Sequence, residues 1–179
     1  MSGLKFDKRE LGNLEYSLDR EMLATDRRGG YMSTTIVGCN TRKYHGLMVA
    51  PIDNSERTYV LLSSLDETLI QHDQAFHLAL HRYNGIYEPR GHKYITDFEY
   101  TPTPTITYRV GGAVLRKELL WIHKRTQLMI RYTLVDAHSE TTLRLRPMLA
   151  FRDKHALSKA NMEADGRAYA IPCGVKCRL

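Results

Sequence analysis

The clearest pattern in the chain is an alternation of apolar and polar residues on both sides of a glycine pair. Residues 105–110 alternate, Gly111 and Gly112 interrupt the pattern, and residues 113–122 alternate again. Two adjacent glycines between alternating runs favour a two-residue hairpin turn, because such turns need positive φ angles. We therefore predict a β-hairpin over residues 105–122.

A turn at this glycine pair fixes which side chains share a face of the hairpin. It places three pairs opposite one another: Val110 and Ala113, Tyr108 and Leu115, and Ile106 and Lys117. The same face continues with Leu119 and Trp121, and the other face carries Thr105, Thr107, Arg109, Arg116 and Glu118. One register therefore separates apolar from polar side chains, with Lys117 as the exception, and this consistency supports the register.

Shorter segments elsewhere show the same period of two. They are residues 75–81, 128–134 and 142–149, where Leu143, Leu145 and Leu149 form the apolar side of the last segment. Residues 46–51 and 59–62 are more continuously apolar and predict buried strands. Turn-forming residues separate the segments at 53–54, 72–73, 84–85 and 136–139. Many short strands with regular turns predict an all-β fold, an antiparallel two-sheet β-sandwich that is supersandwich-like.

Little helix is expected in this chain. Residues 1–25 show no clear periodicity, and a helix is predicted only near residues 155–162. The pairs Ser63-Ser64 and Gly29-Gly30 lack the surroundings of a catalytic serine turn or a phosphate-binding loop, and we interpret both as turns.

The composition is that of an ordinary soluble protein of 179 residues, of which 42% are hydrophobic. No apolar run approaches the ~20 residues of a membrane span. The charged start also lacks the apolar stretch of a signal peptide. We predict a single domain over residues 1–179 without a membrane partner. Since residues 175–179 are strand-like, we expect the domain to be truncated at its C-terminal end.

Cysteine usage points to a reducing compartment. Cys39, Cys173 and Cys177 are odd in number and have no disulfide-framework spacing, which favours reduced thiols and a cytoplasmic location. Cys173 and Cys177 could form half of a metal site, but no second Cys or His pair with suitable spacing follows. We expect neither a metal nor a cofactor.

The net charge of +6, from 26 basic and 20 acidic residues, raises the possibility of a nucleic-acid partner. The basic residues are scattered, however, and their longest runs are pairs such as Arg27-Arg28 and Arg42-Lys43. No stripe of alternating aromatic and basic residues appears. We interpret the charges as a solvated surface and expect no nucleic-acid binding.

Two pairs of chemically active residues fit structural roles better than catalytic ones. Asp97 and Glu99 lie two apart on a predicted strand, so their carboxylates project in parallel about 6–7 Å apart. A glycosidase instead needs two carboxyls that face each other across a sugar. His77 and His81 have the spacing of a helical zinc site, but on the predicted strand they lie about 13 Å apart. We expect no catalytic residue in this chain.

Two polar clusters stand apart from the rest because each lies at the end of an apolar strand, where binding groups are often held. Their candidate residues are Asn40, Arg42, Tyr44 and His45 in the first cluster, and Arg152, Asp153 and His155 in the second. The residues alone leave two interpretations open, which are a binding surface and a set of contacts that hold loops in place.

The segments around these clusters resemble a known family. Residues 26–51 read Asp-Arg-Arg-Gly-Gly-Tyr-Met-Ser-Thr-Thr-Ile-Val-Gly-Cys-Asn-Thr-Arg-Lys-Tyr-His-Gly-Leu-Met-Val-Ala-Pro, and residues 146–155 read Arg-Pro-Met-Leu-Ala-Phe-Arg-Asp-Lys-His. Both are similar to signatures of the N-terminal domain of bacterial- and archaeal-type glycogen debranching enzymes. The chain departs from the family at residues 26–28, which are often uncharged there, and at Lys154, where Tyr is usual.

The resemblance implies a β-sandwich that precedes a catalytic (α/α)6 barrel on the same polypeptide. Family members remove α-1,6-linked branch glucose from glycogen-type glucans as amylo-α-1,6-glucosidases, and some also act as 4-α-glucanotransferases. The family's catalytic carboxylates belong to the barrel, which nothing in this chain resembles. We therefore expect the chain alone to be inactive, with the barrel and glycogen or another branched α-glucan as its partners.

A second hypothesis is a free-standing β-sandwich module that binds carbohydrate or protein. The two signatures favour the accessory domain of a debranching enzyme instead. In that case we expect residues 40–45 and 152–155 to meet at one edge of the sandwich, on the side that faces the barrel. An interdomain interface is favoured over direct substrate contact, because such interfaces are typically polar.

Overall fold

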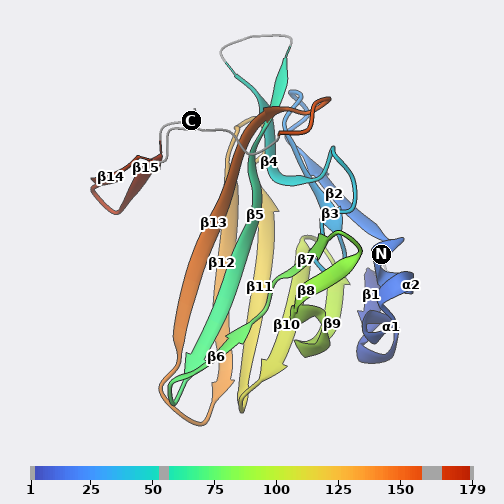
Figure 1. The fold of residues 1–179 in the computed structure, drawn as a ribbon, viewed down its shortest axis with the longest axis vertical. Coiled ribbons are helices and arrows are strands. Elements are labelled where there is room, and N and C mark those ends of the chain that lie inside the picture. Colours follow the sequence, from blue (N-terminus) through green and yellow to red (C-terminus); the bar gives the residue numbers. More distant parts are fainter. Residues whose placement is uncertain (1–2, 53–56, 159–166, 178–179) are drawn as a thin grey trace.

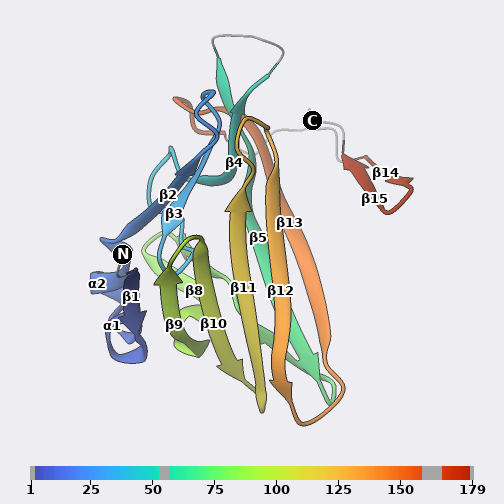
Figure 2. The same ribbon diagram turned by 180° about the vertical axis from the view of Figure 1, so that it is seen from behind.

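The computed structural model describes residues 3–52, 57–158 and 167–177 of the chain. Strands dominate these residues, and they form two large antiparallel sheets that pack face to face, together with two small two-stranded sheets (Figure 1). Figure 2 shows the five-stranded sheet in front of the six-stranded one. The predicted all-β sandwich is confirmed.

The five-stranded sheet contains the predicted hairpin. Its order is β1 (Leu4–Asp7), β9 (Ile95–Tyr100), β10 (Pro104–Val110), β11 (Ala113–Trp121) and β12 (Leu128–Ala137). Strands β10 and β11 pair in the predicted register, with Val110 opposite Ala113 and Ile106 opposite Lys117. Gly111 and Gly112 form the turn with φ angles of 59° and 80°. The glycine pair was therefore a sufficient signal for the turn and its register.

The six-stranded sheet carries the first polar cluster before one strand and the second at the end of another. Its path is β13 (Thr142–Asp153), β5 (Thr58–Gln71), β4 (Gly46–Pro51), β3 (Tyr31–Thr35) and β2 (Glu21–Thr25), with β6 (Gln74–His77) also paired to β5. The predicted buried segments 46–51 and 59–62 thus lie in neighbouring strands. Both polar clusters belong to this sheet.

The remaining elements are short. Strands β7 (Leu80–Tyr83) and β8 (Ile86–Arg90) pair with each other, as do β14 (Ala168–Ile171) and β15 (Gly174–Cys177). A 3-10 helix, η1 (Gly91–Tyr94), leads into β9. The turns predicted at residues 72–73 and 84–85 are confirmed, whereas residues 53–54 lie outside the described residues.

The expectation that residues 1–25 lack regular structure is wrong. They form β1, α1 (Lys8–Gly12), α2 (Leu14–Leu18) and β2. Asp7 caps α1 by accepting from the backbone N–H of Arg9 at 2.8 Å, and the Glu10 side chain accepts in return from the Asp7 N–H. Both helices have five residues, which is too short for a hydrophobic period to emerge.

Three further expectations need correction. Residues 155–158 are not helical, and residues 159–162 of the predicted helix lie outside the described residues. Ser63 and Ser64 lie inside β5 rather than in a turn. Leu145 and Leu149 are exposed although they lie on the apolar side of the predicted segment, and Leu149 follows a shift of register in β13 after Met148.

The core lies between the two large sheets. Its largest fully buried side chains include Met32, Leu69, Phe98, Ile106 and Leu119, which come from both sheets. Lys117, the exception on the apolar face of the hairpin, is buried there and pairs with Glu67 of β5 at 2.6 Å. The charge that broke the sequence pattern therefore joins the two sheets.

Candidate functional site

The two polar clusters meet at one end of the six-stranded sheet. The Arg152 guanidinium donates to the backbone oxygen of Lys43 at 2.5 Å, and the Lys43 ammonium donates to the backbone oxygen of His155 at 3.3 Å. The Tyr44 hydroxyl lies 3.4 Å from His155 Nδ1, and the two rings meet edge to face at 5.6 Å. The predicted approach of residues 40–45 to residues 152–155 is confirmed.

Local geometry holds each cluster in its position. Gly46 begins β4, and a Cβ atom there would lie 2.9 Å from the side chains of Val49 and Val60. Glycine therefore lets the preceding loop run close against β4 and β5. At the other cluster, the Asp153 carboxylate accepts from the His155 N–H at 2.8 Å and closes the turn that follows β13.

A hollow of about 510 Å³ opens beside this meeting point, on strands β2 and β3. We call it the β2–β3 hollow, and its lining includes Glu21, Leu23, Tyr31, Ser33, Arg42, Tyr44 and His45. Its volume falls in the range of about 300–1,000 Å³ typical of small-molecule sites. Three of the predicted site residues, Arg42, Tyr44 and His45, therefore line a common space.

Glu21 is the charged centre of the β2–β3 hollow. Its Oε1 lies 2.5 Å from Arg42 Nε and 3.3 Å from His45 Nε2. His45 is buried, and its Nδ1 accepts from the Thr41 backbone N–H at 3.1 Å, so a proton on the neutral ring belongs to Nε2. Burial lowers the pKa of His45, against the opposing effect of Glu21. His45 is therefore a neutral donor near neutral pH.

Two tyrosines form the aromatic part of the hollow. The Tyr31 hydroxyl donates to the backbone oxygen of Tyr44 at 3.0 Å, which fixes the two residues relative to each other. Burial raises the pKa of Tyr31, although nearby Arg152 opposes the shift. Tyr44 is 40% exposed, although Lys43 Nζ lies over one face of its ring, 5.1 Å from the centroid. The hollow combines aromatic surface with a carboxylate, a guanidinium and an imidazole N–H.

The turn before β3 shapes the rim of the hollow. Asp26 is buried, and its Oδ1 accepts from the backbone N–H of Arg28 at 2.6 Å and of Gly30 at 2.9 Å. Gly29 has a φ of 95°, and a Cβ atom on Gly30 would lie 2.5 Å from the Asp26 carboxylate. The positive φ at Gly29 and the close approach of Asp26 to Gly30 explain why glycine occupies both positions. The two glycines form a turn, as predicted.

A comparison with protein-family models identifies the chain. The model described as "Glycogen debranching enzyme N terminal" matches residues 20–178, which include both polar clusters and all of the β2–β3 hollow. The chain belongs to this family. No curated protein and no solved structure matches it significantly. The described residues include no helix with the length and apolar content that a membrane crossing requires.

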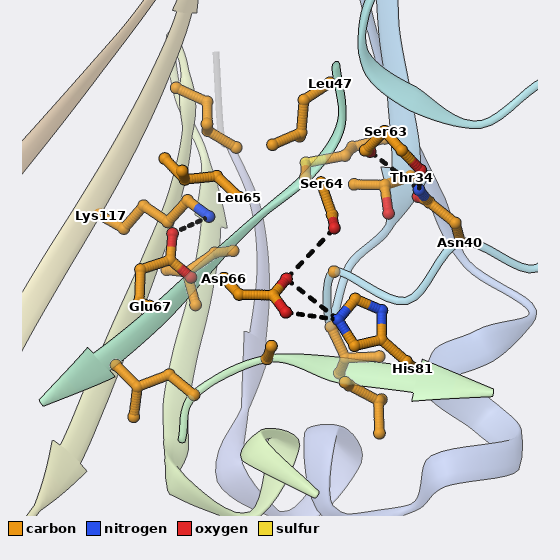
Figure 3. Close-up of a pocket in the computed structure, with 18 of the residues that line it drawn as sticks. Thr34, Asn40, Leu47, Ser63, Ser64, Leu65, Asp66, Glu67, His81 and Lys117 are labelled. Atoms are coloured by element: carbon orange, nitrogen blue, oxygen red, sulfur yellow. Dashed lines mark hydrogen bonds and ion pairs between the residues drawn. The ribbon is translucent and has the colours of Figure 1, made fainter. Parts of the chain in front are cut away.

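Asn40 of this debranching-enzyme domain does not reach the β2–β3 hollow. Its side-chain amide donates to the backbone oxygen of Ser63 at 2.9 Å and to the Ser63 hydroxyl at 3.2 Å (Figure 3). Asn40 thereby ties the loop to β5 and lines a separate inner cavity. Asn40, one of the predicted site residues, therefore holds its loop against β5 and does not line the β2–β3 hollow.

The inner cavity holds a second set of polar groups. His81 Nε2 lies 2.9 Å from Asp66 Oδ2, and the Ser64 hydroxyl donates to Asp66 Oδ1 at 3.2 Å (Figure 3). Burial raises the pKa of Asp66, but the bonds from His81 and Ser64 outweigh it and leave the pKa below its usual value. The cavity measures about 30 Å³, which is room for about one water molecule. The serine bonds the carboxylate rather than the imidazole, so this is not a nucleophile–base pair.

Two other residues considered in the sequence analysis, Glu99 and His77, line neither the β2–β3 hollow nor the inner cavity. Glu99 on β9 pairs with Lys5 at 2.7 Å, and His77 contacts the Thr68 hydroxyl at 3.1 Å. Within the described residues, no group of three or more His, Cys, Asp or Glu side chains could hold a metal ion.

Glu21 and Tyr31 are the most important residues of the hollow that sequence reasoning missed. Glu21 lies in the part of the chain where we expected no regular structure. Its signal was the segment Glu21–Thr25, in which Glu21, Leu23 and Thr25 occupy one side of a short strand and all line the hollow. Tyr31 follows the Gly-Gly turn and lies in the segment that resembles the family, but we assigned no role to it.

Proposed function

We propose that this domain is the N-terminal accessory domain of a bacterial- or archaeal-type debranching enzyme that hydrolyses α-1,6 branch points of glycogen-type glucans. The observation that carries the proposal is the family match over residues 20–178. The carboxylates that line the described cavities agree with a non-catalytic role, because each has a basic partner. These pairs are Glu21 with Arg42, Asp66 with His81, and Glu67 with Lys117.

The catalytic chemistry then belongs to a barrel on the same polypeptide. We further propose that the surface where the two clusters meet faces that barrel. Arg42, Lys43 and Tyr44 are exposed there, and they are held in place by Arg152 and His155. Polar and aromatic groups of this kind suit an interdomain interface, which is typically more polar than an obligate one.

The test is an association experiment between this chain and the catalytic barrel, produced as a separate polypeptide from the full reading frame. Isothermal titration should show binding, and Arg152→Ala should weaken it at least about tenfold because it removes the support of the loop. Arg116→Ala on the outer face of β11 is the matched control and should leave binding unchanged. A reading frame without a barrel, or equal binding by both variants, would overturn the proposal.

A second measurement concerns activity. The purified chain should release no glucose from a branched limit dextrin above the buffer control, because the carboxylates of the β2–β3 hollow and of the inner cavity contact basic side chains and do not face each other across an open space. Glucose release that persists through purification would place catalytic groups in this domain and contradict the accessory role.

A further inference from the structure

The β2–β3 hollow contains a buried donor without an acceptor. His45 is 2% exposed, and its Nε2 makes no hydrogen bond within the structure. The Thr41 N–H occupies Nδ1, so Nε2 carries the proton. Its nearest acidic atom is Glu21 Oε1 at 3.3 Å, without hydrogen-bond geometry. A buried donor left without an acceptor is costly, so the hydrogen bonding at this point of the hollow is incomplete.

Glu21 and Arg42 supply the complementary groups. Arg42 engages Glu21 through Nε, while most of the Arg42 side chain remains exposed. The carboxylate has acceptor sites to spare, and the guanidinium has further N–H groups, because a carboxylate accepts up to about four hydrogen bonds and a guanidinium donates five. The hollow therefore offers donors and acceptors side by side, an arrangement that suits neighbouring hydroxyl groups, since each hydroxyl both donates and accepts.

Apolar surface lies next to these polar groups. Tyr44 and Leu23 are both exposed beside them, and Tyr31 is partly exposed. A pyranose ring presents C–H groups on its faces and hydroxyls at its edges. A ring in the hollow could thus contact the tyrosines while its hydroxyls meet the more exposed Glu21 and Arg42.

The charge of the hollow selects a neutral ligand. Glu21 and Arg42 cancel each other, and His45 is kept neutral by its burial. For an anion such as phosphate the attraction of Arg42 is offset by the repulsion of Glu21, and for a cation the signs are reversed, so the pair gives neither kind of ion a net attraction. Among neutral molecules, an apolar one would leave the remaining donors of Arg42 and acceptors of Glu21 unmatched.

We propose that the β2–β3 hollow is a subsite for one glucosyl unit of an α-glucan. The identity of the sugar rests on the proposed function, whereas the requirement for a neutral polyhydroxyl ligand rests on the geometry alone. The subsite lies on the accessory domain itself. Because Arg42 and Tyr44 also belong to the surface proposed to face the barrel, the subsite would hold a glucan chain where the two domains adjoin.

The experiment titrates this chain with maltotriose and with isomaltose by isothermal calorimetry. We expect dissociation constants of about 1 mM, as for a single weak subsite. Glu21→Gln removes the charge without changing the size, and Tyr44→Ala removes the exposed aromatic face. Each should weaken binding at least about tenfold. Inorganic phosphate should give no binding heat.

The matched control is Tyr169→Ala on β14, because Tyr169 is about as exposed as Tyr44 but lies outside the hollow. It should bind maltotriose as the unaltered chain does. Circular dichroism verifies that every variant is folded, and a chemical-shift titration of the unaltered chain locates the sugar independently of any variant. Absence of binding, shifts outside residues 21–45, or phosphate binding would overturn the subsite.

This outcome is independent of the test of the proposed function. The sugar titration contains no barrel, and the barrel association contains no sugar. A chain that binds the barrel but not maltotriose disproves the subsite alone. A chain that binds maltotriose without any barrel partner disproves the accessory role and favours a free-standing carbohydrate-binding module.

Discussion

Two carboxylates in this domain each pair with a basic side chain, yet they occupy opposite environments. Glu67 and Lys117 lie between the sheets, with only 3% and 8% of their side chains exposed. Glu21 and Arg42 lie at the β2–β3 hollow, where 67% of the Arg42 side chain is exposed. The comparison separates a charge pair that belongs to the fold from one that is available to a ligand.

The inner pair has a further hydrogen-bonding partner in Tyr132. Glu67 Oε1 lies 2.6 Å from the Lys117 ammonium and accepts from the Tyr132 hydroxyl at 2.5 Å. Burial raises the pKa of Tyr132, and the neighbouring Glu67 charge raises it further. The same two causes act on Tyr108, whose pKa is well above its usual value. The tyrosines therefore stay neutral donors, and one of them stabilises the buried carboxylate.

The outer pair differs because a neighbouring hydrogen-bond donor, His45 Nε2, has no partner. His45 Nε2 faces Glu21 without forming a hydrogen bond, and the hollow beside them is open. A satisfied and buried network fixes a structure, whereas unused donors at an open hollow are what a binding site offers. Both regions contain a charge pair, and they differ in whether the polar groups around that pair have hydrogen-bond partners.

The largest expected effect comes from breaking the inner pair. Lys117→Met keeps the apolar stem but leaves the Glu67 carboxylate buried without its cation. The free energy of unfolding should fall by about 3–5 kcal/mol, because an uncompensated buried charge is costly. Urea denaturation at neutral pH, followed by circular dichroism, measures the change.

Two controls make this prediction sharper. Lys5→Met breaks the exposed pair with Glu99 and should change the free energy of unfolding by less than about 1 kcal/mol. A double variant with Glu67→Gln and Lys117→Met removes both charges and should recover most of the lost stability. Equal losses in the single and double variants would show that side-chain packing, and not charge, dominates at this position.

The second prediction concerns pH and involves the outer region. Burial lowers the pKa of His45 and of His92 in the folded chain, so the unfolded chain binds more protons when the pH falls below about 6.5. The free energy of unfolding should therefore decrease between about pH 7.5 and pH 5.5. Protonation of His45 would also place a second positive charge beside Arg42.

Denaturation at both pH values in His45→Gln and His92→Gln checks this assignment. Each variant should show a smaller decrease than the unaltered chain, since glutamine does not titrate. Should the decrease stay the same in both variants, other groups carry the pH dependence.

The inner region could be predicted from sequence to a useful extent. The Gly111-Gly112 turn fixed the hairpin register, and that register marked Lys117 as a charge on an apolar face. Its partner could not be found, because Glu67 is distant in the chain and the pairing depends on how the two sheets stack. The sequence therefore shows that Lys117 is an unexpected charge, whereas the fold is needed to show that Glu67 is its partner.

The outer region was predictable in part for a different reason. Arg42, Tyr44 and His45 follow one another in a polar cluster before an apolar strand, so position alone indicated them. Glu21 was missed because a five-residue strand gives too little periodicity to recognise. Asn40 was included although its amide is used by Ser63, since a cluster shows proximity in sequence but not the direction of a side chain.

The smallest stability effect should come from Arg42→Ala. Solvent screens the exposed Arg42 guanidinium, so the loss of its contact with Glu21 should change the free energy of unfolding by less than about 1 kcal/mol. The same substitution should lower the affinity for maltotriose, because it removes donors from the hollow and leaves Glu21 without a counter-charge. Urea denaturation and calorimetry on one protein preparation measure both effects. A loss of stability comparable to that of Lys117→Met would mean that the outer pair also belongs to the fold, and the distinction between the two regions would fail.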